Sequence, residues 1–252
     1  MSEIGVYKIV LWGWIALAPL TLGLLLFVSA PYGRHSRDGW GPSIGRTGGW
    51  ILMESPALWA MPLLYLLGDR VGELVPTLLL AAWLVHYSNR VLIFPLRMRG
   101  GNQRNPLLIV AFAFFFNLVN AYLQGRWLFA LGPALPRSWL ADPRFVAGAL
   151  LMAFGFATNL RADAKLRALR ARGDGYHIPR GGLFELVSCA NYLGEIIEWI
   201  GWALCTWSLA GLSFALWTVA NLLPRALAHH RFYQQRFADY PARRRAIIPY
   251  VL

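Results

Sequence analysis

Two carboxyl groups and an amide recur at helical spacing in the apolar segment ANYLGEIIEWIGWAL. Asn191, Glu195 and Glu198 occupy positions i, i+4 and i+7, so an α-helix would place all three on one face. Such a stripe in so apolar a helix is difficult to explain as a solvated surface. It predicts a buried polar site.

A second stripe lies in NLLPRALAHHRFYQQRFADYPARRR, where Arg225, His229 and Tyr233 follow one another at i+4 steps. If this helix packs against the first stripe, its arginine faces acidic groups. Alternatively, the segment is an amphipathic helix in the membrane interface, with its arginines on the wet side.

Ionisable groups also interrupt two apolar segments nearer the N-terminus, namely Glu54 in WILMESPALWAMPLLYLL and Arg90 in LVHYSNRVLIF. An ionisable residue inside a membrane-spanning helix is costly and marks a functional site by default. Glu54 either pairs with an arginine of a neighbouring helix or stays neutral and donates a hydrogen bond. Tyr87 shares a helix face with Arg90, and Arg90 could simply hold that corner together.

Asn159 and Asp163 lie one turn apart, and a basic run that includes Lys165, Arg167 and Arg170 follows them. The group is either part of a polar site or the basic flank of a membrane helix with a cap at its end. Arginine forks match phosphate oxygens. Together, the polar groups predict a membrane cavity that opens to the cytoplasm and whose basic rim could receive an anionic ligand.

Apolar segments must position these groups. The chain has 252 residues, of which 57% are hydrophobic and only 14% charged, whereas soluble domains average roughly 45–50% and 25%. A membrane-spanning helix takes about 20 apolar residues, so this length holds six or seven helices and no separate soluble domain. The sequence predicts an all-α integral membrane protein, a single domain over residues 1–252, with seven transmembrane helices around the cavity. The expected spans are 9–30, 47–68, 74–96, 106–124, 145–160, 186–206 and 210–232.

The net charge of +12 indicates orientation rather than nucleic-acid binding. Most lysines and arginines lie in the loops and tail that seven spans place on the side of the C-terminus, which the positive-inside rule assigns to the cytoplasm. The N-terminus is then outside, in a bacterial inner membrane or an endoplasmic reticulum membrane according to the source. The sequence contains no GxGxxG motif, P-loop or zinc spacing, and we expect no metal.

At these polar residues the sequence resembles the steroid 5α-reductase (3-oxo-5α-steroid 4-dehydrogenase) family, as a bacterial-type homologue closest to the type 2 enzymes. The segments that carry the resemblance are IPRGGLFELVSCANYLGEIIEWIGWALCTWSLAG and HHRFYQQRFADYPARRRAIIPYVL, with TNLRADAKLRALR, MES and HYSNR. The resemblance covers most of the chain beyond about residue 45 and is most specific in the C-terminal part.

The resemblance implies a seven-helix domain, monomeric among membrane lipids, that encloses NADPH and a lipid-soluble enone. It implies reduction of the Δ4 double bond of a 3-oxo-Δ4-steroid to the 5α-dihydro product, with hydride to C5 and a proton to C4. Negative charge then develops on the C3 oxygen, where hydrogen-bond donors stabilise it. By the resemblance, Glu54 and Tyr87 are the catalytic donors, which requires a protonated Glu54.

The resemblance also implies a cofactor site. Acids and amides would bind the ribose and the nicotinamide carboxamide, while arginine and histidine meet phosphates, and arginine at the cytoplasmic end suits the 2′-phosphate of NADPH. The residues implied are Arg90, Asn159, Asp163, Arg170, Tyr176, Asn191, Glu195, Arg225, His229 and Tyr233.

Three positions depart from the family pattern. Met53 stands where a glutamine usually precedes the catalytic glutamate, and we expect it to contact the substrate beside Glu54 and Tyr87. His177 replaces an arginine and Phe94 replaces a tyrosine. Both changes would loosen cofactor contacts without changing the reaction.

Three other functions stay open. The protein could be a related membrane enone or enoyl reductase that acts on a polyprenal or an acyl thioester. An isoprenylcysteine-type methyltransferase would need no deep pair such as Glu54 and Tyr87. A non-catalytic lipid-binding or transport protein would lose only binding when Glu54 is substituted.

Overall fold

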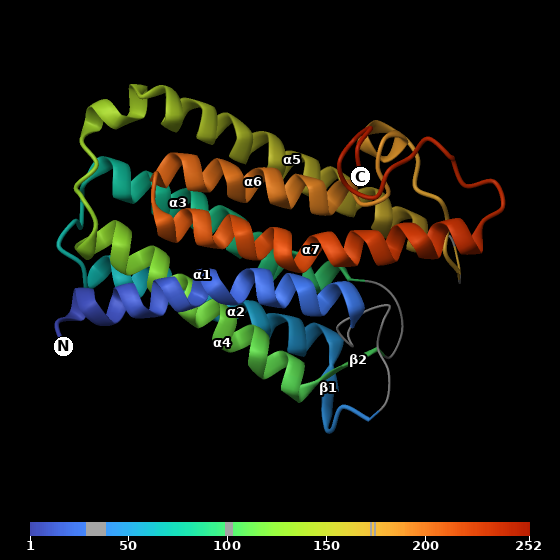
Figure 1. Ribbon diagram of the computed structural model, residues 1–252, viewed down its shortest axis with the longest axis horizontal. Helices are drawn as coiled ribbons and strands as arrows, with labels where there is room; N and C mark the ends of the chain where they lie inside the picture. Colours follow the sequence, from blue (N-terminus) through green and yellow to red (C-terminus); the bar gives the residue numbers. More distant parts are fainter. Residues whose placement is uncertain (29–38, 99–102, 172, 174) are drawn as a thin grey trace. The chain divides into compact units, whose positions relative to one another are not determined.

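The computed structural model describes residues 1–28, 39–98, 103–171, 173 and 175–252; the last two residues of the expected first span lie outside them. Within the described residues the protein is all-α, with one short antiparallel strand pair (Figure 1). The helices are α1 (Glu3–Phe27), α2 (Arg46–Leu66), α3 (Leu74–Ser88), α4 (Leu107–Arg126), α5 (Pro143–Arg170), α6 (Ala190–Thr206) and α7 (Leu209–Arg236), and the strands are β1 (Ser43–Gly45) and β2 (Arg104–Pro106).

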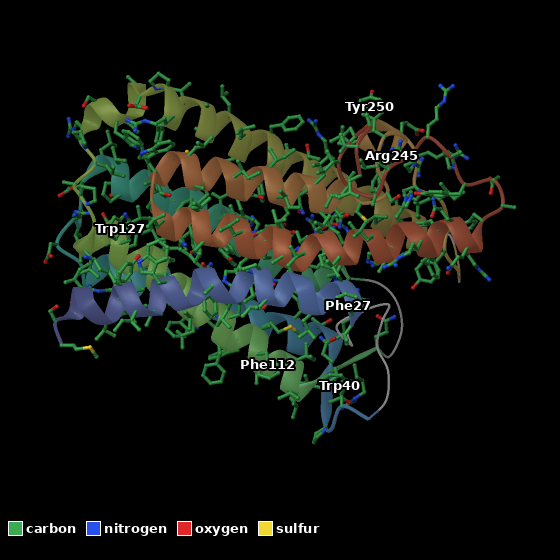
Figure 2. The ribbon with its side chains drawn as sticks, in the orientation of Figure 1. Phe27, Trp40, Phe112, Trp127, Arg245 and Tyr250 are labelled. Carbon is green, nitrogen blue, oxygen red and sulfur yellow. The ribbon has the colours of Figure 1, made fainter. Side chains whose placement is uncertain are left out.

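In the described part of the chain, four helical segments are long and apolar enough to cross a membrane. They are Glu3–Phe27, Leu74–Arg97, Leu107–Leu131 and Pro143–Arg170. Large apolar side chains on these segments are exposed, among them Phe27 and Phe112 (Figure 2), as expected for side chains that contact lipid. The protein is therefore an all-α membrane protein, while the expected count of seven spans stays a prediction.

Helix α6 begins at Ala190, later than the expected start at residue 186. The backbone amides of Ser188 and Cys189 donate to the carbonyls of Arg245 and Ala246. These residues therefore pair with the C-terminal segment instead of extending the helix.

The break between α6 and α7 lies at Trp207 and Ser208, between the expected spans 186–206 and 210–232. Trp207 has a φ of 42°, a left-handed conformation that a right-handed helix cannot contain. Helix α5, by contrast, continues to Arg170, well beyond the expected end of its span at residue 160. The extension is rich in alanine, leucine and arginine, which favour helix in water as well as in lipid.

The chain divides into two compact units. The first consists of Met1–Trp12, Ala30–Val146 and Cys205–Ala210, and the second of Gly13–Ser29, Ala147–Leu204 and Gly211–Leu252. In the first unit α2 packs along α4. A Cβ atom at Gly125 of α4 would lie only 2.8 Å from Leu64 Cδ1 of α2, so glycine permits this approach.

In the second unit α5 and α6 approach each other through glycines on both helices. A Cβ atom at Gly155 would lie 2.5 Å from Gly194 O, and one at Gly201 would lie 2.5 Å from Gly148 O. Any larger residue would collide with backbone atoms, so the contact depends on glycine, as in other close helix pairs of membrane proteins. This contact brings the polar side chains of the two helices within hydrogen-bonding distance.

Candidate functional site

Glu54 lies on α2 beside a proline that interrupts the helical hydrogen bonds. Pro56 has no N–H group to donate to the carbonyl of Leu52. The hydroxyl of Ser55 donates to that carbonyl instead, at 3.1 Å. The α-helix continues through this segment, and the Ser55 side chain satisfies the carbonyl that Pro56 leaves without a backbone donor.

Two side chains from neighbouring elements approach the Glu54 carboxyl. Asn117 Nδ2 on α4 lies 3.4 Å from Glu54 Oε2 and 2.8 Å from the carbonyl oxygen of the buried Met53. Arg90 Nη2 lies 4.0 Å from Glu54 Oε1, and the two side chains are only 11% and 18% exposed, respectively. The pairing with an arginine of a neighbouring helix, left open by the sequence, is thus present at the outer limit of an ion pair.

Arg90 is held by an irregular turn and by aromatic rings. Helix α3 passes into a π-helical turn at Asn89–Ile93, a feature that is frequent at functional sites. The Arg90 guanidinium lies over the rings of Trp50 and Phe94, 4.8 and 5.0 Å from their centroids. Trp50 Nε1 also donates to Arg90 O at 3.0 Å. Phe94 thus holds Arg90 through a cation–π contact.

Tyr87 is almost completely buried on α3, with 3% of its surface exposed. Its ring packs against Trp83 and, edge-on, against His86, with centroids 4.7 and 4.9 Å away. Trp83 Nε1 donates to the carbonyl of Ala57 at 2.8 Å and so ties α3 to α2. The two residues predicted to be catalytic therefore lie on helices that are joined directly.

Four of the predicted cofactor residues form one hydrogen-bonded cluster on α5 and α6. Asn159 Nδ2 donates to Asn191 O at 3.0 Å and to Glu195 Oε2 at 3.3 Å. Asn191 Nδ2 donates to Asp163 Oδ1 at 3.2 Å. Asn159 and Asp163 are buried, whereas Asn191 and Glu195 are half-buried. These contacts favour a polar site over a helix-end cap.

The three residues of the predicted polar stripe on α7 lie in different surroundings. His229 Nε2 lies 3.3 Å from the hydroxyl of Tyr192 on α6, and Arg225 is half-buried. Tyr233 is buried and stacks on Tyr240, with centroids 5.5 Å apart and planes 8° from parallel. Tyr233 therefore has a clear packing role in addition to the role predicted for it.

Two further predicted cofactor residues lie where α5 ends and the following loop begins. Arg170 is the last residue of α5 and is exposed. Tyr176 is 40% exposed and packs edge-on against Phe232 of α7, with centroids 4.9 Å apart. The adjacent His177 is exposed.

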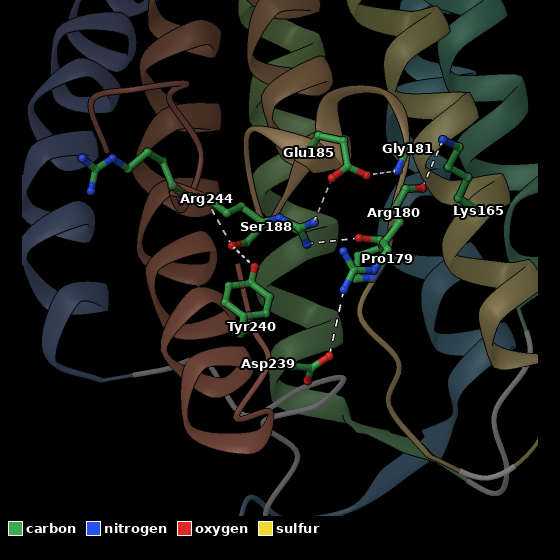
Figure 3. A network of polar contacts seen from close by, with 10 residues as sticks. Lys165, Pro179, Arg180, Gly181, Glu185, Ser188, Asp239, Tyr240 and Arg244 are labelled. Carbon is green, nitrogen blue, oxygen red and sulfur yellow. Dashed lines mark hydrogen bonds and ion pairs between the residues drawn. The ribbon is translucent and has the colours of Figure 1, made fainter. Parts of the chain in front are cut away.

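A polar network holds the loop that leads into α6 (Figure 3). Arg244 is fully buried; its Nη1 donates to Pro179 O at 3.1 Å and its Nη2 lies 3.7 Å from Glu185 Oε2. The hydroxyls of Ser188 and Tyr240 are 2.6 Å apart. Burial raises the pKa of Tyr240 above its ordinary value, so this hydroxyl stays protonated at neutral pH. The network fixes the backbone immediately before Asn191 and Glu195.

Sequence reasoning missed Asn117, Trp50 and Tyr192. Asn117 interrupts the apolar run AFAFFFNLVNAYL, so the rule that singled out Glu54, a polar group within a span, could have found it. Tyrosine and tryptophan are ordinary in membrane helices, and Trp50 and Tyr192 gave no signal of their own.

Apolar helices that carry buried carboxyl, amide and guanidinium groups define a membrane protein with polar sites inside its helical units. Residues 103–252 match the family model for 3-oxo-5-alpha-steroid 4-dehydrogenase. The chain is 46% identical over 232 residues to steroid 5-alpha-reductase DET2 of Gossypium hirsutum, with 90% of each chain covered. The chain belongs to the 3-oxo-5-alpha-steroid 4-dehydrogenase family, whose members are oxidoreductases.

Animal relatives have a comparable sequence identity to this chain. The chain is 42% identical to 3-oxo-5-alpha-steroid 4-dehydrogenase 1 of Bos taurus, over 94% of this chain and 93% of that protein. It is 42% identical to the protein of the same name from Homo sapiens, over 87% and 85%. These matches confirm the resemblance seen in the sequence, while a particular likeness to type 2 enzymes stays a prediction.

Proposed function

We propose that this protein uses NADPH to reduce the Δ4 double bond of a 3-oxo-Δ4-steroid, giving the 5α-dihydro-3-oxosteroid. Membership of the family supports the reaction. The observation that carries the residue roles is the Glu54 carboxyl, largely buried on α2, on a helix that Trp83 ties directly to the helix of the buried Tyr87.

The reaction needs hydrogen-bond donors at the C3 oxygen of the steroid. Negative charge develops on that oxygen as hydride arrives at C5, and fixed donors in a site that excludes water stabilise it. We assign these donors to a protonated Glu54 and to the hydroxyl of Tyr87. Met53, buried and next to Glu54, contacts the substrate with them.

NADPH supplies the hydride when it is bound. The donor set on α5 and α6 fits this cofactor, because the amides of Asn159 and Asn191 match a carboxamide and the carboxyls of Asp163 and Glu195 match ribose hydroxyls. Arginine and histidine would bind the phosphates. The proposed cofactor residues are Arg90, Asn159, Asp163, Arg170, Tyr176, Asn191, Glu195, Arg225, His229 and Tyr233.

In the membrane, the proposed arrangement is a monomeric single domain of seven spans with the N-terminus outside and the C-terminus in the cytoplasm. Cysteines introduced at either end test the orientation, because the native Cys189 and Cys205 are both buried and give little background. If an impermeant reagent labelled a cysteine at residue 252 in intact cells or in sealed right-side-out vesicles, the result would contradict a cytoplasmic C-terminus.

The reaction is tested with membranes that contain the protein, NADPH and testosterone or progesterone, with products identified by mass and stereochemistry. We expect a 5α-dihydro product that is lost in Glu54→Ala and kept in Glu73→Ala, a control carboxyl that is exposed. NADPH binding without reduction of a steroid would move the search to other enones. Absence of NADPH binding would refute the reductase proposal itself.

A further inference from the structure

The side chain of Trp83 contacts the Tyr87 ring. Trp83 lies on α3, is fully buried, and shares a helix face with Tyr87 at the i, i+4 spacing. The centroids of the two rings are 4.7 Å apart, and the ring planes are 34° from parallel. His86 packs edge-on against the Tyr87 ring at 4.9 Å. Because a tyrosine side chain has only two torsions, a ring held by these neighbours has a fixed direction for its hydroxyl group.

The polar end of Trp83 is attached to α2. Its Nε1 donates to Ala57 O at 2.8 Å, and both residues are fully buried. Ala57 follows Glu54 by three residues, so the two lie on one face of α2, about one turn apart. A buried indole N–H group usually finds such an acceptor. The hydrogen bond therefore connects the ring that contacts Tyr87 to the helical turn that carries Glu54.

Two donors can serve one carbonyl oxygen only when they are correctly placed relative to each other. Each donor must lie about 2.7–3.1 Å from the position where the charge develops, and a misplacement of about 1 Å costs on the order of 100-fold in rate. We propose that Trp83 is a positioning residue that sets the Tyr87 hydroxyl relative to the Glu54 carboxyl at the C3 oxygen of the steroid. The inference rests on the proposed function, because it assigns a role within that reaction.

A second buried tryptophan provides a matched control. Trp217 on α7 also donates through Nε1 to a backbone carbonyl of another helix, that of Trp14 on α1, at 2.9 Å. Its ring packs against the ring of Trp14, with centroids 5.0 Å apart, and the residue is 7% exposed. Trp83→Phe and Trp217→Phe therefore each remove one indole N–H donor and keep an aromatic ring. Only the first removes the link between the turn of Glu54 and the ring of Tyr87.

The first readout is turnover in a double-mutant cycle. We expect Trp83→Phe to lower kcat about tenfold, equivalent to about 1.4 kcal/mol, and Trp217→Phe to stay within about twofold of the parent. In the Tyr87→Phe background the hydroxyl group is already absent, so Trp83→Phe should lower kcat by no more than about twofold further. A tryptophan that served packing alone would lower kcat by the same factor in both backgrounds.

The second readout is the C3 carbonyl stretching band of a bound 3-oxo-steroid that is isotopically labelled at C3. It is measured by infrared difference spectroscopy in the presence of NADP⁺, which carries no transferable hydride. Because a hydrogen bond to a carbonyl oxygen lowers its stretching frequency, the band should move to higher frequency in Trp83→Phe and in Tyr87→Phe. It should stay in place in Trp217→Phe, and the double variant should show no movement beyond that of Tyr87→Phe.

The carbonyl band separates this inference from the proposed reaction. If the parent binds the steroid without reducing it, the proposed function fails, while a band that moves in Trp83→Phe but not in Trp217→Phe still supports the positioning role. If the parent reduces the steroid and Trp83→Phe matches Trp217→Phe in both readouts, the positioning inference alone is overturned. Losses of kcat that add in the double variant would overturn it as well.

A parent that binds no 3-oxo-steroid would refute both the proposed function and the role of Trp83. If Trp83→Phe does not accumulate in membranes, benzothienylalanine incorporated in place of Trp83 or Trp217 makes the same comparison. This residue replaces the indole N–H group by sulfur and keeps the shape of the ring system, so only the hydrogen bond is lost.

Discussion

Replacement of Gly194 by alanine should separate α5 from α6 and weaken cofactor binding. A Cβ atom at this position would lie 2.7 Å from Asn159 N and 2.7 Å from Gly155 O. Atoms in ordinary contact with carbon lie about 3.5–4.0 Å away. Both obstacles are backbone atoms, so no side chain can turn aside and the helices must move apart by about 1 Å.

That movement is enough to break the polar cluster. Asn159 Nδ2 lies 3.0 Å from Asn191 O and 3.3 Å from Glu195 Oε2, and a separation increased by about 1 Å exceeds hydrogen-bonding distance. Overpacking costs about 1–3 kcal/mol, and each lost hydrogen bond costs about 1 kcal/mol. We therefore expect Gly194→Ala to lower the free energy of unfolding by roughly 3–5 kcal/mol and to raise the Kd for NADPH about tenfold or more.

The assay measures the Kd for NADPH by fluorescence. The thermal midpoint of the purified protein is measured alongside it. Gly23→Ala is the matched control, because Gly23 also lies inside a helix but a Cβ atom there would meet nothing within 4 Å. The control should be neutral or slightly stabilising. If Gly194→Ala bound NADPH as tightly as Gly23→Ala does, the cluster on α5 and α6 would not be the cofactor site.

The remaining predictions concern individual side chains. Glu54→Ala should lower kcat by on the order of 100-fold or more and Glu54→Gln by less, because the amide keeps a donor; equal turnover in both variants and the parent would remove Glu54 from the mechanism. Tyr87→Phe should lower kcat by on the order of 100-fold with NADPH binding retained, and a loss of binding alone would reassign Tyr87. Arg225→Ala should raise the KM for NADPH about tenfold, as expected for the loss of one charge-assisted hydrogen bond; an unchanged KM contradicts its contact with phosphate. The hydrogen bond from Arg144 lowers the pKa of Asp142 from 3.8 to about 2. Because the folded state has the lower pKa, this stabilisation is complete above about pH 4 and is lost as the pH falls towards 2, so the difference in thermal midpoint between the parent and Asp142→Asn should shrink over that range. A difference that does not change with pH would refute this assignment.

Much of the fold could be predicted because apolar segments of a membrane protein are long and continuous. Each of the seven expected spans overlaps a helix within the described residues. The ends of the helices were predicted less accurately, because they depend on contacts between residues that are distant in the sequence. The start of α6 is set by backbone bonds from Ser188 and Cys189 to the C-terminal segment, and no local pattern reveals such a pairing.

The candidate site was predictable where polar residues share a helix and less so where partners come from different helices. The spacing of Asn191 and Glu195 placed both on one face, and the structure brings them to Asn159 and Asp163. Asn117 could not be paired with Glu54 from sequence, because that contact joins α2 to α4, two helices that are not consecutive in the chain.

Two irregular positions of the helices lie beside groups that are proposed to do chemistry. Pro56 follows Glu54, and the π-helical turn contains Arg90. An unsatisfied backbone group in a membrane costs several kcal/mol, so such irregularities persist only when side chains complete the missing bonds, as Ser55 does for the carbonyl of Leu52. Donors near the site therefore support the backbone and the chemistry together. A variant that only loses activity cannot distinguish these two roles, and each test must pair turnover with a measurement of binding, stability or protonation.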